Sequence, residues 1–280
     1  MILQRRAFLA GTAASVASFA LGNTPISTLV ISPDSRAMQG GWLRGRVQPG
    51  STALKLDGKP VALADDWAFL IAFDRDATPL ARIEVTLPGG RPFVHEFAIA
   101  PRAWQIEHIN VARKPGGVTS EEYLRLRRAE LARIAAARAV DTGAQGWRQS
   151  FIRPAPGRFS GRFGSQRIYK GEPAAYHSGL DIAGGAGTTY VAPAEGIVTL
   201  AAQSPFSLEG RLLMLDHGMG LNSAFLHASE LLVREGDKVA QGTPLGRIGA
   251  TGRATGPHLH WSMKWQASRI DPLLFLPDQT

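Results

Sequence analysis

Short runs of strand-forming residues, separated by turns rich in glycine and proline, recur through most of this chain and constrain its fold more than any other feature. Such runs, bounded by turn residues at short intervals, are typical of small antiparallel β-structures. In the first part of the chain they predict a β-sandwich-like domain, immunoglobulin-like in spacing, over residues 26–110. The runs are STLVIS (27–32), GWLRGRV (41–47), WAFLIAF (67–73), ARIEVTL (81–87) and FVHEFAI (93–99).

A second block of such runs follows Pro154 and contains many glycines. Its short strands predict an antiparallel sheet, or two packed sheets, in a C-terminal domain over residues 151–280. The whole chain is therefore expected to be mainly β. The runs are GRFSGRFGS (157–165), GIVTLAA (196–202), GRLLMLDHG (210–218), LNSAFLHAS (221–229), GTPLGRIGA (242–250) and HLHWSMKW (258–265).

One segment between the two blocks has a different character and predicts a linking α-helix. TSEEYLRLRRAELARIAAARAV (119–140) is rich in Ala, Leu, Arg and Glu, and Thr119 with Glu122 can form a capping box at its start. Its length corresponds to about five to six turns. We expect it to be the main element of a helical linker over residues 111–150, with a solvated basic face.

The composition narrows the classes of partner and of metal site. The net charge is +8, from 31 Lys and Arg against 23 Asp and Glu, which favours nucleic acid, anionic lipid or bacterial cell-wall polymer. Nucleic acid is a poor fit, because no recognised DNA- or RNA-binding motif accompanies the charge. The chain has no cysteine, so disulfides and thiolate sites are excluded and a metal would need His, Asp or Glu.

The first residues resemble a secretory signal peptide, predicted over residues 1–25. Arg5 and Arg6 precede a short, weakly apolar run rich in Ala, Gly and Ser. Because Phe8 and Leu9 follow the paired arginines, the twin-arginine export route is favoured over an ordinary Sec signal, which stays the alternative. The apolar run is short for a membrane span. We therefore expect an exported protein, with an uncleaved N-terminal anchor as the other possibility.

Histidines with metal-ligand spacing gather in the C-terminal block. His258 and His260 are one residue apart, so on a strand both imidazoles face the same side. His177 and Asp181 are four residues apart, an even spacing that returns both side chains to one face of an extended segment. Together with one histidine of the His-Leu-His pair they make a set of two histidines and one carboxylate. Three such ligands and one open position are how a catalytic zinc site is built.

Three stretches resemble the signature blocks of the lysostaphin-type (LytM-like) zinc metallopeptidases, which cut peptides of bacterial peptidoglycan. The stretches are HSGLDIA (177–183), FLHAS (225–229) and TGRATGPHLHW (251–261). The resemblance covers roughly residues 157–272, and the N-terminal sheet with its helix resembles the accessory region of exported relatives. Phe225 stands where a tyrosine is frequent and Ala228 where a leucine is usual, but neither change removes a ligand or a titrating group.

The resemblance implies a zinc ion, Zn2+, as cofactor, with His177, Asp181 and His260 as its ligands. It implies His227 and His258 as non-ligand catalytic histidines, without dividing their roles. The implied activity is endopeptidase cleavage of peptidoglycan peptide cross-links, in a Gram-negative periplasm between D-Ala and meso-diaminopimelate. A cell-wall protein partner of the N-terminal domain and the oligomeric state stay open.

Other functions stay open beside this one. Some domains of this type have lost the site and act as non-catalytic activators of cell-wall amidases or as binding modules, whereas this chain has lost no ligand. A zinc carboxypeptidase also ends in His-x-His, but it typically has a longer step between the first His and the Asp than the four residues here. Residues before Gly157, or the loop RIYKGEPAAY (167–176), could also cover and inhibit the site.

The remaining polar and aromatic residues near the motifs have simpler expected roles. We expect structural or surface positions for three histidines: His95, His108 and His217. For His217 the functional alternative is a hydrogen bond that orients one of the metal ligands. Two aromatic residues are expected in the core or at the cleft rim: Trp261 and Trp265. For three residues, lining of the cleft and formation of turns are about equally good explanations: Asn222, Arg253 and Thr255.

Overall fold

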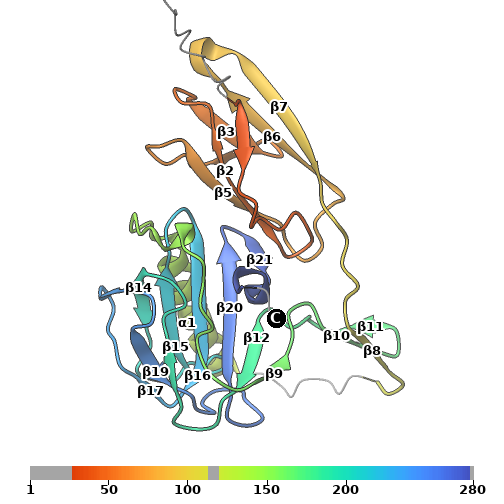
Figure 1. Ribbon diagram of the computed structural model, residues 1–280. Coiled ribbons are helices and arrows are strands. Elements are labelled where there is room, and N and C mark those ends of the chain that lie inside the picture. The colour runs from red at the N-terminus through yellow and green to blue at the C-terminus, as the bar shows by residue number, and fades with distance from the viewer. Residues whose placement is uncertain (1–26, 113–119, 278–280) are drawn as a thin grey trace, which may run out of the picture.

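The computed structural model describes residues 27–112 and 120–277, and within these ranges the protein is mainly β with one α-helix. The predicted fold class is confirmed. Figure 1 shows two bodies, with strands β2, β3, β5, β6 and β7 in the upper one and the large sheet with α1 in the lower one. The predicted signal peptide, residues 1–25, lies outside the described residues.

The N-terminal body consists of two antiparallel sheets, as expected for a sandwich-like domain. One sheet has the order β1-β2-β5 and the other the order β4-β3-β6-β7. Strand β6 alternates buried and more exposed residues, so one of its faces lies in the core. The strands are β1 (Leu29–Ile31), β2 (Trp42–Val47), β3 (Ala53–Leu56), β4 (Lys59–Val61), β5 (Ala68–Ala72), β6 (Leu80–Thr86) and β7 (Pro92–Ala98), with a 3-10 turn at Pro88–Gly90.

One hairpin in this body is not predicted by the alternation pattern. The segment LDGKP looks like a turn between strands, but it contains the end of β3 and the start of β4. Asp57 and Gly58 form the two-residue loop, both with positive φ, at 48° and 76°. Two positive φ values in succession are what a tight hairpin turn requires, and Asp-Gly is a favoured pair for it.

The C-terminal body is built on an eight-stranded sheet in the order β18-β14-β15-β16-β20-β12-β9, with β21 paired to β20. Its strand pairs are antiparallel, as predicted. The strands are β9 (Arg158–Gly161), β12 (Leu180–Ala183), β14 (Gly196–Ala201), β15 (Arg211–Asp216), β16 (Leu221–Ala228), β18 (Lys238–Val239), β20 (Leu259–Trp265) and β21 (Ser268–Ile270). A smaller sheet contains β13 (Thr189–Val191), β19 (Pro244–Arg247) and β17 (Glu230–Leu231).

A further small sheet combines a strand that follows the N-terminal body with two strands of the C-terminal body. It has the order β11-β10-β8, made of β8 (Ile106–Ile109), β10 (Gln166–Tyr169) and β11 (Glu172–Pro173). Strand β8 follows the N-terminal body and pairs in parallel with β10 of the C-terminal body. The segment that follows the N-terminal body therefore adds a strand, β8, to the C-terminal body. Two further 3-10 turns lie at Gly146–Arg148 and Pro272–Phe275.

Helix α1 spans Glu121–Ala139 and begins one residue later than a cap at Thr119 would place it. Ser120 is the N-cap, and its hydroxyl accepts a hydrogen bond from Tyr123 N at 3.1 Å. Thr119 itself lies outside the described residues.

The helix packs on one face of the eight-stranded sheet, in addition to linking the two bodies. Ala137 lies in an apolar cluster with Ala224 of β16 and other sheet residues. Arg127 donates two hydrogen bonds to the Glu209 carboxylate, at 2.6 and 2.7 Å. These contacts attach the helix to the sheet along most of its length.

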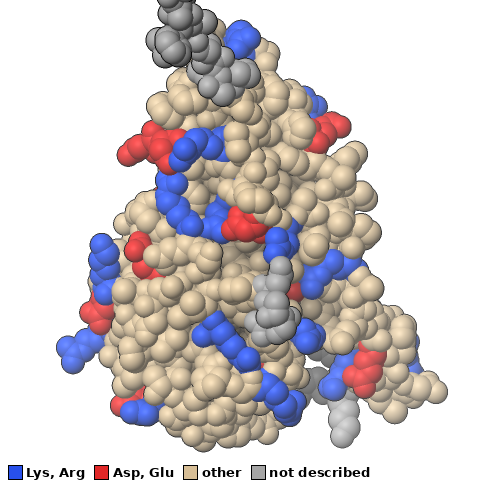
Figure 2. Space-filling model, viewed as in Figure 1, with Lys and Arg blue, Asp and Glu red and all other residues tan. Residues whose placement is uncertain are grey.

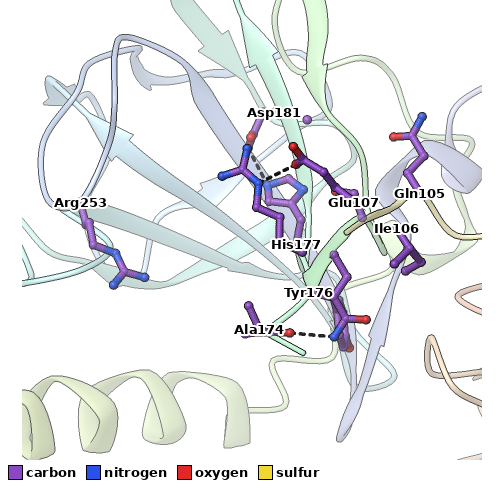
Figure 3. Close-up of a pocket in the computed structure, with 13 residues that line it drawn as sticks. Gln105, Ile106, Glu107, Ala174, Tyr176, His177, Asp181 and Arg253 are labelled. Atoms are coloured by element: carbon purple, nitrogen blue, oxygen red, sulfur yellow. Dashed lines mark hydrogen bonds and ion pairs between the residues drawn. The ribbon is translucent and has the colours of Figure 1, made fainter. Parts of the chain in front are cut away.

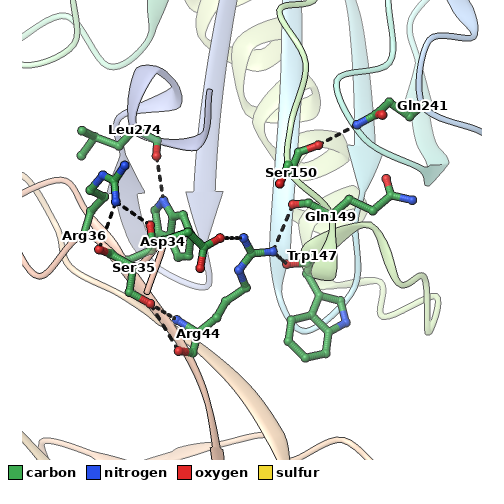
Figure 4. Close-up of polar contacts among 10 residues, drawn as sticks. Asp34, Ser35, Arg36, Arg44, Trp147, Gln149, Ser150, Gln241 and Leu274 are labelled. Atoms are coloured by element: carbon green, nitrogen blue, oxygen red, sulfur yellow. Dashed lines mark hydrogen bonds and ion pairs between the residues drawn. The ribbon is translucent and has the colours of Figure 1, made fainter. Parts of the chain in front are cut away.

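The two bodies meet in a junction of polar contacts, which Figure 4 shows, and of aromatic contacts. Arg44 of β2 donates from Nη1 to the carbonyl oxygens of Trp147 and Gln149, each at 3.0 Å. The Trp42 ring stacks on Phe275 with 4.8 Å between centroids. One apolar cluster contains buried residues of both bodies, so the bodies pack as a unit.

The surface agrees with the basic composition. Figure 2 shows Lys and Arg side chains spread over both bodies on that face, with Asp and Glu among them. Across the described residues, no helix combines the length and the apolar character that crossing a membrane demands.

Candidate metal centre

Two neighbouring strands bring the three predicted ligands together. β12 carries Asp181, and its antiparallel partner β20 carries His260 directly opposite. His177 lies four residues before Asp181, in the segment that enters β12. His260 Nδ1 lies 2.8 Å and His177 Nε2 lies 3.0 Å from Asp181 Oδ1. One candidate ligand atom of each residue lies within 4.8 Å of the others.

A backbone contact orients the His177 ring toward this cluster. Its Nδ1 lies 3.1 Å from the carbonyl oxygen of Arg162, and a carbonyl only accepts, so Nδ1 carries the proton. In the neutral ring Nε2 then presents a lone pair toward Asp181 Oδ1. Two lone pairs that face each other at this distance are stabilised by a cation between them. Two imidazoles and one carboxylate are a donor set that suits Zn2+.

The charges of the three groups also suit a cation. Burial disfavours the Asp181 carboxylate, but the hydrogen bonds that His177 and His260 donate when their rings are protonated outweigh burial and hold its pKa well below the usual range. Burial lowers the pKa of His260. Burial also opposes charge on His177, although the hydrogen bond to Asp181 raises its pKa overall. Asp181 is therefore ionised at neutral pH, while the deeply buried His260 favours the neutral, electron-donating ring.

His258 lies beside the three residues without replacing His260. Its Nδ1 lies 2.8 Å from the carbonyl oxygen of Gly256, so Nδ1 donates and Nε2 faces the cluster. Nε2 is 3.8 Å from Asp181 Oδ1, farther than the 2.8 Å of His260 Nδ1.

His227 of β16 completes a histidine-lined edge. Its Nδ1 lies 2.9 Å from the carbonyl oxygen of Thr251, and its ring centroid lies 5.0 Å from that of His258. The backbone of His227 has φ of 67°, in the left-handed region that non-glycine residues rarely adopt. Burial lowers the pKa of the ring. Nε2 is therefore the free nitrogen of a ring that favours the neutral form.

A pocket of about 910 Å³ opens beside His177 and Asp181. Figure 3 shows Arg253 on one side of this pocket, and Glu107 and Tyr176 on the other. Arg167 of β10 binds Glu107 of β8, with Nε 2.8 Å from Oε2. The wall of the pocket thus includes residues that come directly after the N-terminal body.

The loop 167–176, which the sequence suggested could cover the site, contributes wall residues including Arg167 and Tyr176. Sequence reasoning did not single out Glu107. This residue reaches the site only because β8 pairs with β10, about 60 residues later in the chain, and no short-range pattern marks that pairing. Arg253 lines the pocket, in agreement with one of its two expected roles.

Other singled-out residues lie away from the cluster. His217 is fully buried, with Nδ1 2.7 Å from Glu195 O and Nε2 2.8 Å from Ser223 Oγ, so it has a structural position. Asn222 is also buried and donates to Asp216. Two histidines are exposed in or near the N-terminal body: His95 and His108. Two tryptophans lie in the core: Trp261 and Trp265. Thr255 is an exposed loop residue.

Comparisons with known proteins show that the region around the centre is similar to a peptidase family. Residues 175–272 match the model of Peptidase family M23. Over 107 residues the chain is 35% identical to the peptidoglycan DD-endopeptidase ShyA of Vibrio cholerae. The matched region covers 38% of this chain and 24% of that protein. Over 124 residues it is 35% identical to the lipoprotein NlpD/LppB homolog of Pseudomonas aeruginosa. That matched region covers 44% of this chain and 39% of that protein.

The likeness to a solved structure extends over both bodies. A Pseudomonas aeruginosa crystal structure assigned to peptidase M23 superposes with a TM-score of 0.66 at 28% identity, covering 86% of this chain and 95% of that one. The chain spans only 24% and 39% of the length of the two relatives named above.

Proposed function

Since residues 175–272 belong to peptidase family M23, we propose that this protein is an exported zinc metalloendopeptidase that hydrolyses peptide cross-links of peptidoglycan. The convergence of His177, Asp181 and His260 within 4.8 Å carries the proposal. The name of the relative ShyA, a peptidoglycan DD-endopeptidase, supports the substrate class. As the finer assignment we propose the bond between D-Ala and meso-diaminopimelate in a periplasmic cell wall.

In the proposed mechanism His177, Asp181 and His260 hold the metal. Zinc, when bound, polarises the scissile carbonyl and lowers the pKa of water enough for attack at neutral pH. Nε2 of His227 and Nε2 of His258 are the free ring nitrogens at this edge of the site. One, in its neutral form, accepts the proton of the attacking water, and the other, in its protonated form, donates a hydrogen bond from Nε2 to the developing oxyanion. The lowered pKa of His227 favours its proton-accepting form.

A non-catalytic activator of cell-wall amidases is the second candidate. The likeness to a lipoprotein, the NlpD/LppB homolog, keeps this function open, because that name states no enzymatic activity. The intact set of three candidate ligands and two further histidines favours the enzyme.

The test pairs zinc content with cleavage of purified cross-linked muropeptides, for the wild type and three variants. We expect about one zinc per chain and cleavage in the wild type. His260→Ala should lose both. His227→Ala should keep zinc but cleave at least ~100-fold more slowly, because it loses a proton-transfer or oxyanion contact. His95→Ala, at an exposed histidine of the N-terminal body, is the matched control and should behave as wild type.

Mass spectrometry of the products identifies the bond. Zinc binding without cleavage in the wild type would contradict the enzyme and favour the activator. Undiminished cleavage by His260→Ala would remove the metal centre from the mechanism.

A further inference from the structure

The face of β20 that carries His260 continues along the strand to Lys264. Along β20 the residues alternate, with His260, Ser262 and Lys264 partly exposed on one face and the intervening residues buried on the other. Four residues of strand place Lys264 roughly 13 Å from His260 along this face.

Helix α1 packs over the same face of the sheet. Leu226 and Ala224 of β16 stand directly opposite His260 and Ser262, so they share the face of those residues. Both pack in the cluster that contains Ala137 of α1. Just after the helix, Thr142 N donates to Asp216, which stands opposite Asn222, the residue opposite Lys264. The last turn of the helix therefore lies toward the Lys264 end of this face.

Three cations approach one another at the Lys264 end of this face. Lys264 stands directly opposite Arg269 of β21, and such pairs have neighbouring side chains. Burial, and after it the charge of Arg269, lower the pKa of Arg138, in the last turn of α1, to about 10. Burial lowers the pKa of Lys264 as well, followed by the charges of Arg138 and Arg269. The three groups thus lie within electrostatic reach of one another.

The cluster lacks a matching set of anions among the described residues. Nε and Nη1 of Arg138 are buried there without a hydrogen-bond partner. Asp74 approaches from the N-terminal body, accepting a hydrogen bond from Arg269 N at 2.8 Å. Glu209, whose charge favours the charged form of Arg138, is held by two hydrogen bonds from Arg127. A buried cation without a counter-charge is costly, so an anion from outside would be strongly favoured here.

We propose that Arg138, Lys264 and Arg269 form a subsite that binds a free carboxylate of the substrate peptide, away from the bond that is cut. This inference rests on the proposed function, because it takes the ligand to be a peptide that crosses the centre at His260. An extended peptide covers roughly 13 Å in about four residues, and in fewer when the carboxylate ends a long side chain. The planar guanidinium of Arg138 suits a carboxylate better than a neutral carboxamide.

The test compares two cross-linked muropeptides that differ only in whether their free carboxylates are present or converted to carboxamides. Calorimetric binding and cleavage are both measured for the zinc-loaded full chain. We expect the wild type to bind the carboxylate form about tenfold more tightly or better. Arg138→Met and Lys264→Met should lose most of that preference. Arg125→Met, at an exposed arginine of the same helix, is the matched control and should retain it.

Thermal unfolding separates recognition from a structural role. Arg138→Met removes a buried charge without a partner, so its unfolding temperature should stay the same or rise. A lower unfolding temperature, with equal loss of binding for both muropeptides, would overturn the proposal in favour of a structural arginine.

The two readouts distinguish this inference from the proposed function. Preferential binding of the carboxylate form without cleavage would support the subsite and contradict the enzyme. Cleavage with equal affinity for both forms would support the enzyme and overturn the subsite. A wild type that binds neither muropeptide would overturn both.

Discussion

His217 and His260 show how surroundings give two buried histidines different properties. His217 lies between a backbone carbonyl and a serine hydroxyl, which satisfy both ring nitrogens of a neutral imidazole. His260 instead turns Nδ1 to an ionised carboxylate, 2.8 Å away. The first arrangement stabilises a fold, whereas the second presents an electron pair where a cation can bind.

A pH dependence of stability follows for His217. Burial lowers its pKa from 6.5 to about 4 in the folded protein. Between these values the unfolded chain binds a proton that the folded protein does not, so stability falls as pH decreases through this window. The free energy of unfolding should fall by about 3 kcal/mol from pH 7 to pH 4, with little contribution above about pH 7.

Urea denaturation at several pH values, with chelator in every sample, measures this slope. His217→Gln cannot take up the proton, so its stability should depend less steeply on pH in the same window. Parallel slopes for the wild type and His217→Gln would contradict the assignment.

At the scale of elements, three neighbouring strands position the centre. β12 holds Asp181 between β9 and β20, and Gly161 of β9 stands opposite the Asp181 backbone. A Cβ atom at Gly161 would lie 2.3 Å from Asp181 Oδ2, closer than any real contact allows. The absence of a side chain on β9 therefore leaves the space in which the carboxylate sits.

Gly161→Ala should weaken the centre without unfolding the sheet. The added methyl group displaces the Asp181 carboxylate, and we expect zinc affinity to fall about tenfold to a hundredfold. Competition with a chromophoric chelator measures this affinity. Gly256→Ala is the control, since a Cβ there meets nothing within 4 Å. Equal affinity in Gly161→Ala and Gly256→Ala would show that the carboxylate does not depend on this space.

At the scale of the whole molecule, the N-terminal body supports the cleft wall through Arg75. This buried arginine donates from Nε and Nη2 to Gly164 O, at 3.2 and 3.1 Å, and from Nη2 to Gln166 Oε1 at 3.1 Å. Its guanidinium also lies 4.7 Å from the ring centroid of Tyr176. The first body is thus connected to the residue that precedes His177.

Arg75→Ala should affect substrate binding more than the metal. Because the pocket wall is then less firmly held, we expect KM for cross-linked muropeptides to rise several-fold. A rise of that size corresponds to roughly the free energy of one charged hydrogen bond. Zinc content and kcat should stay near wild type, because no candidate ligand contacts Arg75. Steady-state kinetics test this, with Arg82→Ala, an exposed arginine paired with Glu84, as control. An unchanged KM, or loss of zinc, would contradict this supporting role.

The elements that sequence alone predicted depend on short-range geometry. Alternation predicted β20 with His258 and His260 on one face, and the composition of residues 119–140 predicted α1 to within two residues. The even spacing of His177 and Asp181 likewise follows from the period of a strand. The hairpin of β3 and β4 was missed, because its strands are too short to show a period.

The sequence by itself determined the mainly β fold, the helix and the residue types of the centre, since each depends on neighbours within a few positions. Only the tertiary structure decided that His260 lies closer to Asp181 than His258 does. It also decided that β8 forms a wall of the pocket and that Arg138 approaches Lys264. These relations join residues about 60 or more positions apart, and sheet register and helix packing set them through burial of a shared core.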